Sequence, residues 1–184
     1  MIEEREPRLE NRHTGELHAQ QEVSSMAEYR IARAGEGKTM KPSPEEDLVF
    51  KITGEDTDGQ FDYVEGTIQH LGGPPMHVHH FQDETFYVVE GELRFTVGEE
   101  MLDLRAGDFA YIPRGVAHGY VNMKQEPVRG LGVFVPGGFD RFMDEVGQLP
   151  QGPPDPEKMR ELGEKYGQEV VGPPLAVSLG LVQR

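Results

Sequence analysis

The sequence predicts an all-β domain, an antiparallel barrel or sandwich, followed by one or two helices. From Glu28 to about Val135, short apolar or alternating runs are separated by Gly, Pro and Asp, as in antiparallel all-β domains. No helical pattern alternates with these runs, which argues against a parallel sheet. After Pro136 the apolar residues recur at helical spacing instead.

Eight segments are expected to form the strands, because each is a short apolar or alternating run bounded by turn residues. They are residues 48–52, 61–70, 76–80, 85–90, 93–97, 109–112, 118–122 and 128–134. Turn signals such as Gly72-Gly73-Pro74-Pro75 and Pro113-Arg114-Gly115 separate them. Many short strands joined by regular turns favour a sandwich or barrel.

Two helices are expected near the C-terminus. The first ends near Gly147, and its apolar face is formed by Phe139, Phe142, Met143 and Val146. The second has Asp155 as its N-cap and Pro156 as its first residue, and it ends at Gly167. We expect both aromatic faces to pack against the outside of the barrel.

The chain is divided into three parts on these patterns. Residues 1–25 lack aromatic residues and are expected to be a mobile N-terminal tail, with a short helix docked on a partner subunit as the alternative. Residues 26–136 form the barrel. Residues 137–184 form a C-terminal helical extension packed on the barrel, and its last part is an extended arm on the domain or on a partner.

Composition limits the partners and the chemistry. A formal net charge of -15 repels phosphate backbones and anionic membranes, so neither nucleic acid nor a membrane is an expected partner. Cys is absent, so any metal must be held by nitrogen and oxygen. The N-terminus does not have the pattern of a secretory signal, and we expect a cytoplasmic protein.

Three histidines and one glutamate are the candidate metal ligands. His77 and His79 are separated by one residue, a spacing that places both imidazoles on the same face of a strand. Glu84 follows after four residues, which is room for a turn and a returning strand, and His118 offers a third imidazole. This donor set suits one divalent transition metal ion (Fe, Ni, Mn, Co, Cu or Zn) better than Ca or Mg.

These residues resemble the two sequence motifs of the cupin superfamily. The first, HxHxxxxExxxxxxG, matches residues 77–91, and the second, GxxxxxPxGxxHxxxN, matches residues 107–122 at every defined position. One departure is Leu71, where the family has Gly six residues before the first His. The segments PGGFDRFMDEVG and YGQEVVGPPL are similar to the C-terminal extension of single-domain cupins related to bacterial quercetin dioxygenases.

The resemblance implies an antiparallel double-stranded β-helix, also called a jelly-roll or cupin barrel, with the metal near its base. It also implies a homodimer, because cupins commonly cover their sheet edges and apolar outer faces in this way. Glu84 would be the catalytic residue that removes a proton from an enol substrate. A metal-free barrel is the alternative, since some cupins have lost their metal.

Inward-facing apolar residues of such a barrel would line the substrate pocket. By strand parity and position we expect this pocket to be lined by Met76, Phe86, Val88, Phe109, Tyr111, Tyr120 and Phe134. An aromatic wall beside one metal favours a flat, weakly polar or monoanionic small molecule over a sugar nucleotide.

Three functions remain open on these grounds. The first is an oxygen-dependent dioxygenase of a small aromatic or enol substrate, as in quercetin dioxygenases. The second is a non-oxidative metal-dependent isomerase, decarboxylase or cyclase, and the third is a small-molecule-binding cupin without turnover. A fold and a metal shell do not by themselves determine the reaction.

Deletion of residues 1–20 tests the division of the chain. We expect the melting temperature and the metal content to stay nearly unchanged, because this composition offers no contribution to a core. A drop of many degrees on thermal denaturation, or conversion of a dimer to a monomer, would mean that the segment is an ordered arm.

Overall fold

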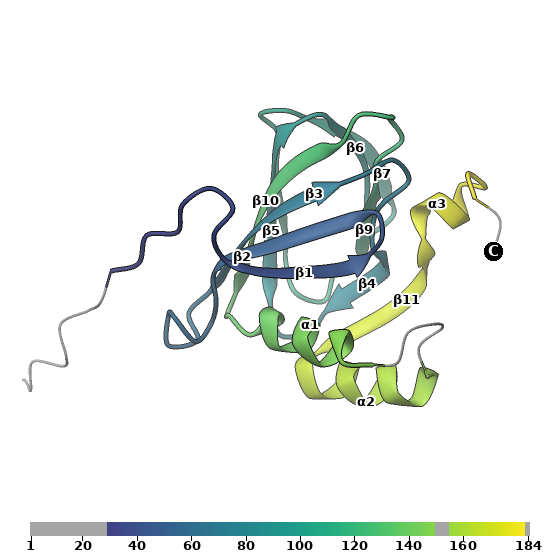
Figure 1. Cartoon of the computed structure of the whole chain (residues 1–184). Coiled ribbons are helices and arrows are strands. Elements are labelled where there is room, and N and C mark those ends of the chain that lie inside the picture. The colour runs from purple at the N-terminus through teal and green to yellow at the C-terminus, as the bar shows by residue number, and fades with distance from the viewer. Residues whose placement is uncertain (1–28, 150–154, 183–184) are drawn as a thin grey trace, which may run out of the picture. The chain divides into compact units, whose positions relative to one another are not determined.

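The computed structural model describes residues 29–149 and 155–182. From Ile31 onward the described residues form one compact unit. In it, two antiparallel sheets pack face to face as a jelly-roll barrel (Figure 1). The expectations for residues 1–25, including the mobile tail, concern residues that the structure does not describe.

The six-stranded sheet has the order β1-β2-β3-β10-β5-β8, and the five-stranded sheet has the order β11-β4-β9-β6-β7. The strands are β1 (Lys38–Ser43), β2 (Glu46–Ile52), β3 (Asp62–Ile68), β4 (Pro75–His79), β5 (Asp83–Glu90), β6 (Glu92–Val97), β7 (Glu100–Arg105), β8 (Phe109–Ile112), β9 (His118–Val121), β10 (Val128–Val135) and β11 (Gln168–Pro174). The helices are α1 (Phe139–Gly147), α2 (Pro156–Tyr166) and the single turn α3 (Leu175–Ser178).

All eight expected strands are present, and the all-β jelly-roll prediction is confirmed. Three further strands, β1, β7 and β11, did not stand out in the sequence, because polar, charged or Pro and Gly residues interrupt their apolar pattern. β11 is an edge strand that pairs with β4, so the last segment is an extended arm on its own domain. Prolines are tolerated at such an edge.

The two longer helices begin and end where the sequence predicts. The Asp155 side chain accepts a hydrogen bond from the backbone N–H of Glu157 at 2.9 Å, which caps α2. Gly167 ends α2 in the left-handed conformation, with φ of 69°. The single turn α3 was not expected, because four residues carry too little helical periodicity to be seen in a sequence.

The turn at Gly91 carries the chain from the six-stranded sheet into the five-stranded one. Gly91 has φ of 90°, and a Cβ atom there would lie 2.7 Å from Cγ2 of Val128. Only glycine fits both constraints. The turn therefore sets how β5, which carries Glu84, is aligned with the opposite sheet.

The interior of the barrel contains two buried hydrophobic clusters. The first is formed by Ile68, Phe86, Val88, Leu93, Phe95, Leu104 and Val128. The second is formed by Phe50, Val64, Phe134 and Met143, with Phe139 and Phe142 packed against it. Three of these residues belong to α1, so the aromatic face of this helix packs against residues of the barrel.

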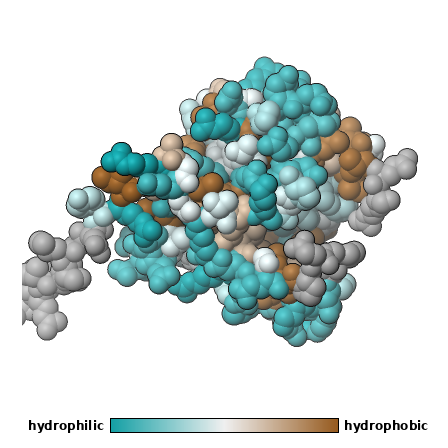
Figure 2. All heavy atoms as spheres, viewed as in Figure 1, coloured by the Kyte–Doolittle hydropathy of each residue, from teal (hydrophilic) through white to brown (hydrophobic). Residues whose placement is uncertain are grey.

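The outer surface in the view of Figure 2 is mostly hydrophilic, with smaller apolar patches between the polar side chains. Across residues 29–149 and 155–182, none of the helices combines the length and the apolar character needed to cross a membrane.

A buried carboxyl group of β2 makes the stability of the fold depend on pH. Glu46 is 4% exposed and its Oε1 accepts a hydrogen bond from the Tyr120 hydroxyl at 3.0 Å. Burial raises the pKa of Glu46 to about 7. Since the folded state then binds a proton more tightly than the unfolded state, stability falls as pH rises from the unfolded pKa of 4.5 through about 7.

Glu46→Gln is expected to remove this dependence, because Gln keeps the acceptor oxygen and cannot ionise. At about pH 8 the variant should be more stable than the native protein by up to about 3 kcal/mol, and the difference should shrink towards about pH 5. Urea denaturation across that range measures it. Equal pH profiles for the two proteins would contradict an ionising Glu46.

Candidate metal centre

The two sheets place the four candidate ligands opposite one another. His77 and His79 lie on β4, and His118 lies on the neighbouring strand β9, where it pairs directly with His77. Glu84 comes from β5 of the other sheet. The alternation of side chains along β4 gives both imidazoles the same direction, so three histidines of one sheet face one glutamate of the other.

The donor atoms converge at short range. Nε2 of His77 lies 3.1 Å from Nε2 of His79, and Oε2 of Glu84 lies 3.0 Å from Nε2 of His79 and 2.9 Å from Nε2 of His118. One ligand atom from each residue can be chosen so that all four lie within 4.8 Å of one another. The structure therefore brings together the four residues that the sequence singled out.

Backbone carbonyls determine the tautomers of two of the imidazoles. Nδ1 of His77 lies 2.8 Å from the Pro75 oxygen, and Nδ1 of His118 lies 3.0 Å from the Val116 oxygen. A carbonyl only accepts, so each Nδ1 must donate its N–H. In a neutral ring the remaining Nε2 then carries a lone pair, and both lone pairs point into the cluster.

This arrangement fits a metal ion. The lone pair of His118 Nε2 and the carboxylate of Glu84 would repel each other at 2.9 Å unless a proton or a cation lay between them. The three imidazoles and the one carboxylate form a nitrogen and oxygen donor set that suits a divalent transition metal. Hydrogen bonds at Nδ1 hold two of the imidazoles in the orientation that such a metal needs. Nδ1 of His79 is buried without a hydrogen-bond partner, so that ring is oriented by packing and by the contacts of its Nε2 with His77 and Glu84.

The ionisation of the cluster reflects the same crowding. Burial lowers the pKa of His77 to about 3, so this ring is neutral in neutral solution. Burial raises the pKa of Glu84, yet hydrogen bonds with His118 and His79 outweigh it and hold that pKa below its ordinary value. Burial also lowers the pKa of His118, but Glu84 more than compensates and raises it. Without a metal, the shared proton therefore belongs to the Glu84 and His118 pair.

Aromatic rings surround the imidazole of His79. The Phe134 ring lies 5.5 Å from it and the Phe139 ring lies 5.4 Å from it, both edge on. Phe134 was among the predicted pocket residues, whereas Phe139 was not. Phe139 could have been considered from its place four residues after the end of β10, but its contact with His79 depends on how α1 turns back over the barrel.

Four of the seven predicted pocket residues face the barrel interior: Phe86, Val88, Tyr120 and Phe134. Phe86 packs edge on against Phe95 at 5.2 Å and lies tilted against Tyr120 at 5.3 Å. Val88 is completely buried in the same cluster. These side chains pack against one another, and a role in substrate binding stays a prediction.

The other three are placed elsewhere, and their prediction as pocket residues is wrong. Met76 has the opposite parity to His77 and packs outside the barrel against the α3 cluster with Val121, Leu175 and Ala176. Phe109 and Tyr111 are 60% and 57% exposed. The pairing of β8 with β5 explains this, because they lie opposite Tyr87 and Thr85 rather than opposite the inward-facing Glu84 and Phe86.

Neighbouring polar residues point away from the cluster, as their parity predicts. His80 is exposed, and its Nε2 pairs with Glu169 at 2.8 Å. Asp83 accepts hydrogen bonds from the side chain of Arg114, which lowers the pKa of Asp83 to about 2. His13 and His18 lie outside the described residues.

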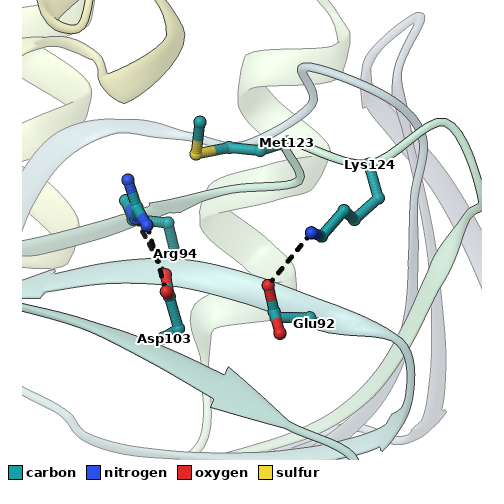
Figure 3. Close-up of a pocket in the computed structure, with 5 residues that line it drawn as sticks. All are labelled: Glu92, Arg94, Asp103, Met123 and Lys124. Atoms are coloured by element: carbon teal, nitrogen blue, oxygen red, sulfur yellow. Dashed lines mark hydrogen bonds and ion pairs between the residues drawn. The ribbon is translucent and has the colours of Figure 1, made fainter.

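A shallow surface hollow away from the centre carries no comparable chemistry (Figure 3). It is lined by Glu92, Arg94, Asp103, Met123 and Lys124. Arg94 forms a two-pronged ion pair with Asp103, and Lys124 pairs with Glu92. Opposite charges thus compensate one another along this wall.

Comparison with known proteins gives the same assignment for the fold. Residues 64–134 match the family described as Cupin domain. The chain is 30% identical over 135 residues to the quercetin 2,3-dioxygenase of Bacillus subtilis, a match that covers 71% of this chain and 39% of the dioxygenase. The chain therefore spans about two fifths of that curated relative.

Solved structures show the same fold. A predicted oxalate decarboxylase of Thermotoga maritima has a TM-score of 0.53 at 18% identity, over 58% of this chain and 99% of that one. The polyketide cyclase RemF of Streptomyces resistomycificus has a TM-score of 0.51 at 24% identity, over 59% of this chain and 79% of that one.

Proton release on metal binding tests the cluster. Because a metal would displace the proton shared by Glu84 and His118, addition of Co²⁺ or Zn²⁺ to metal-free protein should release about one proton at about pH 6 and fewer at about pH 9. A pH indicator in weakly buffered solution measures the release. His80→Gln is the control and should behave as the native protein, whereas binding without proton release at pH 6 would contradict the assignment.

Proposed function

This chain contains a cupin domain, and on that premise we propose that it is a metal-dependent dioxygenase that uses molecular oxygen to cleave a small aromatic or enol substrate. The observation that carries the proposal is the buried convergence of three imidazole nitrogens and one carboxylate oxygen. The similarity to quercetin 2,3-dioxygenase supports the reaction class. His77, His79, Glu84 and His118 would hold the metal.

The ligand set determines what chemistry the site would support. With three neutral imidazoles and one carboxylate, a bound dication would keep a formal charge of about +1 and would supply Lewis-acid stabilisation of a substrate enolate. His79 and His118 both contact Oε2 of Glu84, and this fixes the direction of the carboxylate. The Glu84 carboxylate would therefore lie next to a group that binds at the centre.

Glu84 is proposed to accept the proton of the substrate. A carboxylate that held a dication would be a weak base, because the cation favours its charged form. Proton transfer therefore requires that the Glu84 carboxylate swings away from the centre as substrate binds.

The surroundings favour a flat substrate of low polarity. The rings of Phe134 and Phe139 lie against His79, and they exclude water from this side of the centre. A planar aromatic enol could pack on such rings, whereas a highly hydrated sugar would lose hydration without compensation.

The alternatives are a non-oxidative isomerase, decarboxylase or cyclase, and a binding protein without turnover. The likeness in fold to a predicted oxalate decarboxylase and to a polyketide cyclase keeps the first alternative open, because one barrel serves several reactions. Oxygen uptake separates the dioxygenase from both alternatives.

The homodimer, the cytoplasmic location and the domain boundaries stay predictions. Exposed apolar side chains on the outer face of β5 and β8, namely Tyr87, Phe109 and Tyr111, are a surface that a second copy would cover. Sedimentation of the purified full-length chain distinguishes a monomer from a dimer.

Oxygen consumption tests the proposed reaction. Metal-free protein is loaded separately with Fe, Ni, Co, Mn and Cu and is mixed with flavonols and smaller aromatic enols. At least one metal should give oxygen uptake above the free-metal control, and Glu84→Gln should lower this rate by at least about 100-fold. An oxygen electrode and substrate absorbance measure the two events separately.

Glu90→Gln is the matched control, because Glu90 lies on the same strand but is exposed. It should leave the rate unchanged. Enol binding without oxygen uptake by any metal form would exclude the dioxygenase, and would favour the binding protein or the non-oxidative enzyme according to whether product forms anaerobically.

A further inference from the structure

The metal centre is covered unequally by the surrounding protein. His79, Glu84 and His118 are buried, whereas His77 is only half-buried. The side of His79 is covered by the Phe139 ring, which is the first residue of α1. A helix, and not a barrel strand, therefore provides part of the wall.

Phe139 lies in the centre of a continuous aromatic contact. Its ring stacks on Phe134 at 4.1 Å between centroids and lies 6.0 Å from the ring of Phe142. Phe142 in turn contacts Tyr166 of α2 at 6.0 Å. If the following turn of α1 moved, Phe142 would separate from the Phe139 ring and leave that ring room to turn away from His79.

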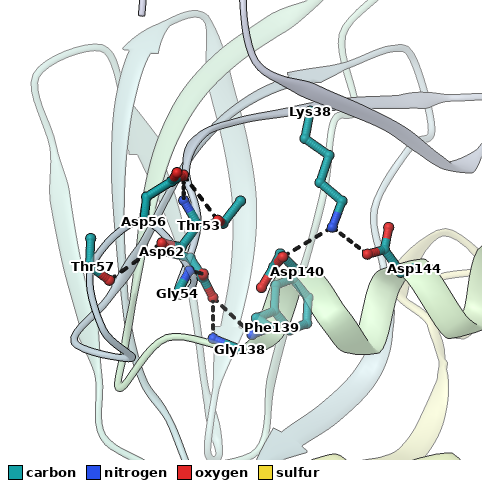
Figure 4. A network of polar contacts seen from close by, with 10 residues as sticks. All are labelled: Lys38, Thr53, Gly54, Asp56, Thr57, Asp62, Gly138, Phe139, Asp140 and Asp144. Atoms are coloured by element: carbon teal, nitrogen blue, oxygen red, sulfur yellow. Dashed lines mark hydrogen bonds and ion pairs between the residues drawn. The ribbon is translucent and has the colours of Figure 1, made fainter. Parts of the chain in front are cut away.

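The beginning of α1 is firmly attached (Figure 4). The Asp62 carboxylate, which is completely buried, accepts hydrogen bonds from the backbone N–H groups of Gly54, Gly138 and Phe139. Buried charge-assisted bonds of this kind are strong and little affected by salt. Gly138 precedes the helix with φ of 118°, a conformation that glycine adopts without strain.

The side of α1 that faces β1 is attached by a different kind of contact. The Lys38 ammonium, from β1, pairs with Asp140 at 3.0 Å and also with Asp144, one turn further along α1 (Figure 4). The Lys38 and Asp144 side chains are 35% and 43% exposed, so water and salt reach this pair. Asp140 is buried, and its Oδ1 has no hydrogen-bond partner.

We propose that α1 is a latched, movable wall of the metal centre: Asp62 anchors its first residue, Lys38 latches its following turn to β1, and release of this latch frees the Phe139 ring to turn away from His79. The contrast between the two attachments supports this division of roles, because a buried anchor with three donors is stronger than a partly exposed ion pair. Asp140 adds to it, since its second oxygen gains a partner from water when the wall opens.

The proposal deepens the proposed function, since a movable wall would control which ligands reach the centre. It rests on that function for its purpose, yet the motion itself can be measured on metal-free protein without substrate. The experiments below can therefore contradict the movable wall without contradicting the proposed dioxygenase activity, and the oxygen measurements can do the reverse.

Histidine modification measures the exposure of His79. Full-length, metal-free protein is treated briefly with diethyl pyrocarbonate, and the initial rate at each histidine is obtained by tandem mass spectrometry. The exposed His80, next in the chain, is an internal reference. Native His79 should react at least about tenfold more slowly than His80.

Breaking the latch should expose His79 selectively. Lys38→Met removes the charge and is expected to raise the rate at His79 by about threefold to tenfold, with His80 unchanged. Salt of about 1 M should raise the rate at His79 in the native protein but not in this variant. Phe139→Ala removes the ring itself and should raise the rate at His79 in low salt.

Lys41→Met is the matched control, because Lys41 lies on the same strand but pairs with Asp47 of β2, at 2.8 Å, instead of with α1. It should have no effect. Should Lys38→Met fail to fold, Asp144→Asn loosens the same latch at its exposed end. The proposal is overturned if native His79 reacts as fast as His80, or if folded latch variants leave its rate unchanged.

Discussion

The constraint on which the site depends is electrostatic: lone pairs and a carboxylate are brought to one point inside an apolar barrel. Two backbone carbonyls accept the Nδ1 protons of His77 and His118. The lone pairs of the two Nε2 atoms are therefore directed towards His79 and Glu84. Neither sheet could hold this arrangement alone, because the imidazoles come from one and the carboxylate from the other. A cation or a proton between the sheets removes the repulsion between the imidazole lone pairs and the carboxylate. The site and the closure of the barrel therefore stabilise each other.

The packing of the barrel keeps these polar groups in place. One apolar cluster, around Phe86 and Phe95, fills the interior beside the Tyr120 and Glu46 pair. The other, around Phe134, packs against His79 and continues into α1. Buried carboxyl groups therefore lie in both regions, and each has a hydrogen-bond donor, as the cost of burying an unpaired charge requires.

The sequence contained the ligands because they follow local rules. Period-two spacing determines that His77 and His79 share a face, and the family motifs add Glu84 and His118. The pocket is harder to predict, because β8 has only four residues, too few for alternation to show which of them face inward. Only the pairing with β5 determines that Phe109 and Tyr111 face outward. Phe139 could not be inferred from spacing, since its contact with His79 depends on packing between segments 60 residues apart in the chain.

The pairing of β4 with β11 affects how the protein is made. β4, which carries two of the ligands, gains its outer neighbour from Gln168 to Pro174, almost at the end of the chain. A ribosome must therefore synthesise about 90 further residues after His79 before that strand is flanked on both sides. Such long-range contacts form late and slowly. Until then the outer backbone edge of β4 is unpaired, and an unpaired edge is where another strand can add by mistake.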